Sequence, residues 1–263
     1  MNDGSPMRRV VIWLLSGVAS VSLTMLVFFP AAWLASLVET RTEGRLTLGD
    51  AHGTLWQGSA FIGGSAGGSG AVTPLLPGRF SWRLSPLVLL GWFDAELENT
   101  EALSHPISVE GGWHEWKVSP GTLQLPAERL AALGAPLNTV LPSGQMLLSW
   151  ETLQLTQQKG IFGVTGSMNL EIIDMASRLS PVKPMGSYAL TFDWQGMQAS
   201  VMLKTVKGPV LLSGSGTFSN GQLQFSGKAE ADASQEEKLE NFLNLLGQRR
   251  KEGNKDVIAL EFK

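Results

Sequence analysis

The chain has 263 residues, a formal net charge of −3 and no cysteine. The absence of cysteine excludes disulfides and cysteine-based metal or redox sites. Charges of both signs are nearly balanced and no basic stripe exists, so nucleic-acid binding lacks its electrostatic basis. Glycine is abundant, at 30 residues, and 13 prolines add further turns. This composition favours an all-β protein with short strands.

The N-terminal region contains a run without one charged residue, from Val10 to Val38. About 20 apolar residues cross a bilayer as a helix, because a helix satisfies its own backbone hydrogen bonds in lipid. A cleavable signal peptide has an apolar core of only about 7 to 15 residues. A buried helix of a soluble domain rarely stays uncharged for so long. The sequence therefore predicts an uncleaved transmembrane signal anchor over residues 10–38.

The flanks of this run predict its orientation. Arg8 and Arg9 precede it, and basic flanks are retained on the cytoplasmic side. We therefore expect residues 1–9 to form a cytoplasmic tail and residues 39–263 to form a periplasmic domain. Pro30 should end or kink the helix because it lacks an N–H group. The residues predicted to contact lipid are Val10, Ile12, Trp13, Leu14, Leu15, Leu23, Leu26, Phe28 and Phe29.

Period-two alternation of apolar and polar side chains recurs after the anchor. It is clear in residues 45–48 and 79–84, and it predicts antiparallel strands with one buried and one wet face. The apolar residues 87–93 are expected to continue into the strand that contains Ala95 and Leu97. Trp113 and Trp116 fall in a predicted strand or hairpin. Further strands are expected over residues 146–155, 162–173, 188–194, 197–206, 210–218, 223–231 and 257–262.

Two short helices are predicted among the strands. Residues 126–133 begin with proline and are followed by Gly134, a pattern typical of a helix start and exit. The second helix follows Ser234-Gln-Glu-Glu237, which has the form of a capping box, and Gly247 is expected to supply a left-handed exit. Its apolar stripe, at helical spacing, consists of Leu239, Phe242, Leu243 and Leu246.

The predicted fold class is mainly β. It combines one N-terminal transmembrane helix with a periplasmic antiparallel β domain, either a sandwich or a curved sheet, and two short helices. A predicted turn and strand that ends in tryptophan occurs three times, in residues 76–82, 141–150 and 186–194. Two similar halves, residues 45–135 and 137–263, are one explanation. Chance likeness among glycine-rich β segments is the other.

No constellation of catalytic or metal-binding residues stands out. His52, His105 and His114 are not spaced as metal ligands. Ser65 lies in a formal nucleophile-elbow pattern, but a real elbow turns from a strand into a helix, which is not expected here. We interpret the surrounding glycine-rich segment, residues 63–70, as a flexible loop. The sequence predicts a protein that is not an enzyme and uses no cofactor and no metal.

Several segments together resemble protein N of the bacterial type II (general) secretion pathway. They are residues 53–58 (Gly-Thr-Leu-Trp-Gln-Gly), 141–150, 184–188, 208–216 and 225–231, the last leading into the leucine-rich helix. Their order and the single N-terminal anchor carry the resemblance. It implies an accessory subunit in the inner membrane. Its periplasmic domain would contact other secretion components, between the inner-membrane platform and the outer-membrane secretin, during export of folded proteins. It implies no catalytic residue.

Partners of this kind would bind a sheet edge or an exposed apolar patch. The candidate residues are Trp113, Trp116, Leu239, Phe242, Leu243 and Leu246. Packing of the four helix residues against the sheet is the alternative to their binding a partner.

A fainter likeness to AsmA-type envelope proteins raises a second hypothesis, binding or transfer of lipid. It rests on analogy of fold. It predicts a groove lined by strand residues such as Phe80, Trp82, Trp150, Phe192 and Trp194, which would otherwise fill a sandwich core. A third hypothesis, an envelope enzyme, has no residue constellation to support it.

Overall fold

The computed structural model describes residues 6–44, 46–64, 73–129, 141–158, 160–219, 222–252 and 255–262. Most of the expected glycine-rich loop lies outside these ranges. So does most of the expected helix over residues 126–133, of which residues 127–129 form a single 3-10 turn. In chain order the elements are α1 (Pro6–Val27), α2 (Ala31–Arg41), β1 (Leu46–Gly53), β2 (Gln57–Gly64), β3 (Thr73–Pro74), β4 (Phe80–Leu84), the 3-10 helix η1 (Pro86–Leu90), β5 (Phe93–Glu98), β6 (Ile107–Gly111), β7 (Glu115–Val118), β8 (Gly121–Pro126), β9 (Pro142–Trp150), β10 (Leu153–Gln158), β11 (Ile161–Ser177), β12 (Gly186–Gly196), β13 (Gln198–Lys207), β14 (Val210–Ser219), β15 (Gln222–Ala231), α4 (Glu236–Leu246), β16 (Gln248–Glu252) and β17 (Lys255–Phe262).

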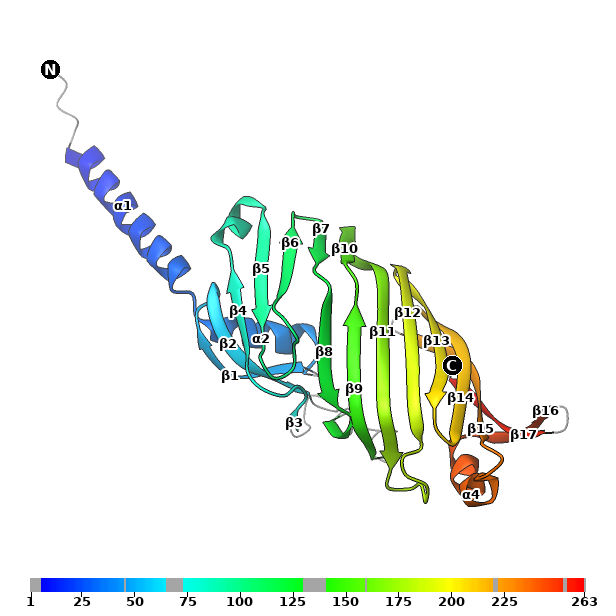
Figure 1. Ribbon diagram of the computed structural model, residues 1–263. Coiled ribbons are helices and arrows are strands. Elements are labelled where there is room, and N and C mark those ends of the chain that lie inside the picture. The colour runs from blue at the N-terminus through cyan, green and yellow to red at the C-terminus, as the bar shows by residue number, and fades with distance from the viewer. Residues whose placement is uncertain are drawn as a thin grey trace.

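The uncharged N-terminal run forms two helices rather than one. α1 ends at Val27, and Pro30 is the extended N-cap of α2. Proline ends a helix in this way because it has no N–H to donate. α1 projects away from the rest of the chain, while α2 packs against β1 (Figure 1).

The strands form one antiparallel sheet of 17 strands that curves along its length (Figure 1). Neighbouring strands mostly follow one another in sequence, from the β1–β2 pair through β4, β5, β6 and β7 to β10. The meander continues through β11 to β15 and ends with β17 and β16. The long strand β11 pairs along one side with both β10 and β9, and β9 in turn pairs with β8. The curved-sheet form of the predicted β domain is therefore confirmed.

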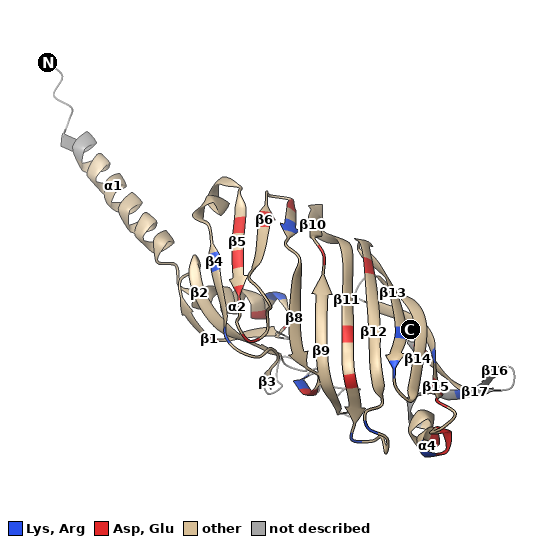
Figure 2. Cartoon of the chain, in the orientation of Figure 1, with Lys and Arg blue, Asp and Glu red and all other residues tan. Residues whose placement is uncertain are grey.

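The register keeps one face of this sheet apolar from end to end. Trp82 pairs with Leu97, and Leu97 pairs with Ile107. Further along, Met168 pairs with Phe192, which pairs with Val201. Residues opposite one another in a ladder point to the same face. The other face carries polar pairs, such as Glu110 with Lys117 and Asp193 with Ser200, and charged residues are sparse on the strands (Figure 2).

Two tryptophans on the apolar face are held in the same way. The indole of Trp82 lies against Gly58 and donates a hydrogen bond of 3.0 Å to the carbonyl oxygen of Leu55. The indole of Trp150 lies against Gly121 and donates one of 2.9 Å to the carbonyl oxygen of Ser119. In each case a Cβ on the glycine would overlap the indole ring. Two of the three similar segments, residues 76–82 and 141–150, therefore share a packing arrangement of tryptophan on glycine as well as a sequence pattern.

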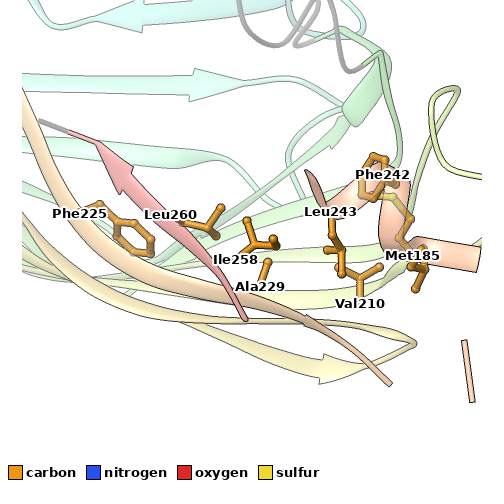
Figure 3. Packing of buried hydrophobic residues seen from close by; sticks show 9 residues of the cluster. Met185, Val210, Phe225, Ala229, Phe242, Leu243, Ile258 and Leu260 are labelled. Carbon is orange, nitrogen blue, oxygen red and sulfur yellow. The ribbon is translucent and has the colours of Figure 1, made fainter. Parts of the chain in front are cut away.

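The principal core lies at the C-terminal end of the sheet, where α4 covers the apolar face. Figure 3 shows these side chains between the strands and α4. Leu239 and Ala229 are fully buried there. The buried members of this cluster are Met185, Val210, Phe225, Ala229, Leu239, Phe242, Leu243, Ile258 and Leu260. A smaller cluster near the N-terminal end comprises Phe80, Ala102, Leu103 and Ile107.

The start of α4 differs from the predicted capping box. The helix begins at Glu236 with Gln235 as its N-cap, and no side chain caps it. The hydroxyl and the N–H of Ser234 instead donate to Oδ1 of Asp232, at 2.6 and 3.0 Å. These two hydrogen bonds lower the pKa of the Asp232 carboxyl. The capping-box prediction was wrong because the hydroxyl of Ser234 donates to the carboxylate of Asp232, two residues upstream, and does not cap α4.

The end of α4 also differs from expectation. Gly247 has φ 177°, which is extended backbone and not the predicted left-handed exit. Glycine is needed here for space, because a Cβ would lie 2.2 Å from the carbonyl oxygen of Ala259. The chain passes directly from helix into β16, which pairs with β17.

Several polar groups in the C-terminal part of the sheet have partners. The Tyr188 hydroxyl is buried and donates to the carbonyl oxygen of Val210 at 3.1 Å; burial raises the pKa of this phenol. The Lys207 ammonium lies 2.8 Å from Asp174 and lowers the pKa of that carboxyl.

We expect Leu239→Ala to destabilise the protein by about 2 to 5 kcal/mol, because it leaves a cavity under α4. Leu179 is exposed in the loop between β11 and β12, so Leu179→Ala is the matched control and should change stability by no more than about 0.5 kcal/mol. Urea unfolding of both variants in the same detergent measures the difference. Equal midpoints for the two variants would show that α4 does not hold this end of the sheet.

Candidate functional site

The N-terminal helix has the properties of a membrane span. Its segment Val10–Val27 has a mean hydropathy of 2.2, and none of it is buried against the rest of the chain. The side chains predicted to contact lipid are exposed, with the exception of Phe29, which is half-buried beyond the end of the helix. Trp13, at 78% exposed, is the most open of them. The chain thus presents one helix long and apolar enough to cross a membrane.

The end of α1 is attached to the turn between β1 and β2. The Trp56 indole donates a hydrogen bond of 2.8 Å to the carbonyl oxygen of Leu26, and the Leu55 N–H donates one of 2.7 Å to the carbonyl oxygen of Phe29. Pro30 and Thr54 form an isolated antiparallel bridge. The last carbonyls of a helix have no partner within it. The turn therefore satisfies backbone groups that the helix leaves open.

The same turn is attached to the sheet on its other side. The indole of Trp82 donates a hydrogen bond to the carbonyl oxygen of Leu55, as described above. The Leu84 N–H donates a second hydrogen bond, of 2.7 Å, to the carbonyl oxygen of Trp56. Gly53 has φ 89°, a left-handed conformation that glycine adopts without strain. The segment Gly53–Gly58 is thus mainly a connector, and β2 starts at Gln57.

A cavity of about 760 Å³ lies beside this connection, between the last turns of α1 and the start of η1. Its apolar lining comes from both sides. α1 contributes Leu23, Leu26 and Val27, and the β4–η1 segment contributes Leu84, Pro86 and Leu89. Sequence reasoning did not identify this cavity, because it depends on two segments about 60 residues apart in the chain.

The six candidate partner residues lie in two separate places. Trp113 is 64% exposed in the turn between β6 and β7. Trp116 is half-buried and stacks on Phe162, with ring centroids 6.2 Å apart. On α4, Leu239, Phe242 and Leu243 are buried in the principal core. The side chain of Leu246 lies outside the described residues.

The five residues proposed to line a groove share the apolar face. Trp150 pairs with Met168 and Met168 with Phe192, so the register carries the face across β9, β11 and β12. Phe80 is buried, while Trp82, Trp150 and Trp194 are half-buried. The indole N–H of Trp194 is buried without a partner among the described residues.

The histidines lie apart and contact mainly backbone or neighbouring side chains. His52 lies 3.4 Å from Asp50 in an exposed pair, and Nε2 of His105 lies 2.9 Å from the carbonyl oxygen of Pro120. Over the ranges that the structure describes, no three or more His, Cys, Asp or Glu side chains are grouped so that they could hold a metal ion.

Comparison with known families decides the relationship. The family model of the type II secretion system (T2SS), protein N, matches residues 44–257. The chain belongs to this family. The resemblance inferred from the turn and strand motifs is confirmed, and the family is a component of a protein secretion machine. No curated protein and no solved structure matches the chain.

The match extends over the sheet and not over the apolar helix α1. It begins two residues before β1 and ends within β17, so it includes the Gly53–Gly58 connector and α4. The family match therefore comes from the β domain. The length, apolar composition and exposure of α1 are a separate observation, outside the matched residues.

Two charges placed within α1 should prevent its insertion into lipid. Each arginine at the helix centre costs about 2.5 to 3.5 kcal/mol on insertion scales. Leu15 and Val18 are both exposed and contact no other element of the chain. We expect the double variant Leu15→Arg, Val18→Arg to leave the membrane fraction after an alkaline carbonate wash, while Leu15→Ile, Val18→Leu stays in it. Full retention of the arginine variant would argue against a membrane span.

Proposed function

We propose that the protein is a non-catalytic accessory subunit of the type II secretion system, anchored in the inner membrane. Its β domain lies in the periplasm and contacts other components during export of folded proteins across the outer membrane. The observation that carries this proposal is the family match over nearly the whole sheet. The exposed apolar helix α1 supports the anchor.

The proposed membrane arrangement uses both N-terminal helices. α1 crosses the bilayer with the tail of residues 1–9 in the cytoplasm, where Arg8 and Arg9 are retained. α2 then lies along the periplasmic surface, so that residues 10–38 act together as the anchor. Trp33 and Leu37 are exposed on α2 at a spacing of four residues, which puts them on one side of the helix.

We propose that the polar face of the sheet supplies contacts with protein partners. Leu239, Phe242 and Leu243 of α4 are already buried in the core, so these three side chains are not available to a partner. On the polar face, Glu110 lies between Asp94 on one neighbouring strand and Lys117 on the other, so Asp94 faces a carboxylate directly opposite it. Like charges opposite one another destabilise a sheet, and a basic partner surface would relieve this repulsion.

Co-purification tests the principal proposal. The full chain should recover other type II secretion components from native membranes in mild detergent. The matched control joins residues 1–44 to an unrelated periplasmic domain, and it should recover none. A second variant, Asp94→Lys with Glu110→Lys, should lose components that bind the polar face while it remains folded. If the full chain and the control recover the same proteins, the proposal fails.

A second candidate function, lipid binding on the apolar face, is favoured by one specific observation. Between the two core clusters several apolar residues of this face are only half-buried, although Met146, Leu153 and Val201 are buried. The half-buried residues include Val164, Met168, Leu170, Phe192 and Phe218. Such a row of half-buried side chains would accept the acyl chain of a phospholipid.

Photolabelling tests the second candidate. The full chain is placed in vesicles that contain a phospholipid with a photoreactive acyl chain, and labelled peptides are mapped. Binding on the apolar face predicts label on β11 to β13 that is lost in Phe192→Glu but kept in Thr191→Glu. Thr191 is the matched control because it precedes Phe192 on the same strand and points to the other face. Label confined to the N-terminal helices and the loops beside them would reject this function.

A further inference from the structure

Large apolar side chains collect along the edge that is formed by strand ends and turns at the top of the sheet in Figure 1. They come from η1, from the β6–β7 turn and from the start of β11. Three of them are more exposed than most side chains of the domain: Leu90 at 73%, Trp92 at 70% and Trp113 at 64%. We call this edge the apolar rim. Its six residues are Leu87, Leu89, Leu90, Trp92, Trp113 and Phe162.

The rim is continuous although its residues come from three segments. The indole of Trp113 lies so close to Gly91 that a Cβ on the glycine would overlap it. Leu87, Trp92 and Trp113 line one cavity together with Trp116. The charged residues Asp94, Glu110, Glu115 and Lys117 also line this cavity. The ring of Trp116 lies 6.5 Å from that of Phe93 and stacks on that of Phe162. Ring-to-ring contact therefore connects the start of β5, which follows η1, to the start of β11 through Trp116.

The rim begins at the end of the membrane helix. Leu89 lines the cavity beside α1 together with Leu23, Leu26 and Val27. The hydrogen bond from Trp56 to Leu26 fixes the end of α1 to the sheet at this place. When α1 spans a bilayer, Leu89 therefore lies at the depth of its last two turns.

The composition of the rim fits a lipid surface. Residues 84–93 contain no charged side chain, although Asp94 follows at once in β5. Tryptophan is enriched where protein crosses from hydrocarbon to head groups, because its ring is apolar and its N–H is polar. Monomeric proteins rarely expose a continuous apolar patch of this kind unless it binds a membrane or a partner.

We propose that the apolar rim inserts into the periplasmic leaflet of the bilayer that α1 crosses. The proposal rests on the proposed function in that it requires α1 to span a membrane. The occupant is lipid, because the rim continues directly from a lipid-exposed helix. Two attachments, α1 and the rim, then hold the strands at a fixed angle to the membrane. The opposite edge of the sheet, with Leu179, points towards the periplasm.

The absence of cysteine provides a direct test of depth. Single cysteines are introduced in the full chain as Leu90→Cys or Phe162→Cys on the rim. Leu15→Cys within α1 marks the hydrocarbon, and Leu179→Cys, an exposed leucine on the opposite edge, marks water. Each is labelled with a nitroxide in vesicles of phosphatidylethanolamine and phosphatidylglycerol. Collisions with oxygen report lipid, and collisions with a water-soluble nickel chelate report solvent.

We expect labels at positions 90 and 162 to lose nickel collisions relative to position 179, and to gain oxygen collisions towards the value at position 15. Equal nickel collisions at positions 90 and 179, with position 15 in lipid, would overturn the rim proposal and leave the anchor intact. A label at position 15 that collides with nickel would reject the anchor itself. Protection at position 90 that disappears when the protein is diluted into more lipid would assign the rim to a second copy of the chain, which also overturns the proposal.

Discussion

Alternation with a period of two, kept in register across the meander, is the constraint on which this structure depends. Because successive side chains of a strand point to opposite faces, a slip of one residue would turn an entire row of apolar residues into water. The ladder runs from Trp82 through Leu97 to Ile107, and from Met168 through Phe192 to Val201, without such a slip. A single sheet with one apolar face needs a cover, and α4 provides it at one end.

The connector Gly53–Gly58 is the second element that the arrangement needs. A helix leaves carbonyl oxygens without a partner in its last turn. The indole of Trp56 donates to one of them, at Leu26, and the Leu55 N–H donates to the carbonyl oxygen of Phe29, just beyond the helix. The opposite side of the same turn is bound by Trp82 and Leu84. Six residues thus connect the exposed apolar helix to the sheet through hydrogen bonds.

Local patterns in the sequence predicted much of the strand content, because period two is visible within one strand. They predicted the helix break at Pro30 for a similarly local reason. The errors arose where a hydrogen bond or a packing contact outside the recognised pattern decides the local structure. Asp232 binds Ser234 in place of the expected cap, and Gly247 is required by the approach of Ala259 on another strand. Residues 87–93, expected to join a strand, instead begin with the 3-10 helix η1, since the hydroxyl of Ser85 accepts from the Leu87 N–H.

The candidate site was predicted less completely than the fold. The sequence motif of the connector, residues 53–58, was recognised. Its hydrogen bond from Trp56 to Leu26 was not, because the two residues lie 30 positions apart. The apolar rim joins three segments that come together only through strand pairing. The α4 stripe was recognised as apolar, and the sequence left open whether it faces the core or a partner. The burial of Leu239, Phe242 and Leu243 places them in the core.

The two ends of the sheet limit how this protein can bind its partners. An open edge strand offers unpaired N–H and C=O groups to any passing strand, and proteins commonly block such edges with helices or positive charges. α2 packs beside β1 at one end. At the other end β16 is short and carries Arg249 and Arg250, which pair with Glu240 and Glu261. Strand addition is therefore disfavoured at both ends, which leaves the two faces and the rim for the proposed contacts. Of these surfaces the polar face suits a water-exposed protein partner best, since the apolar face and the rim carry large apolar side chains.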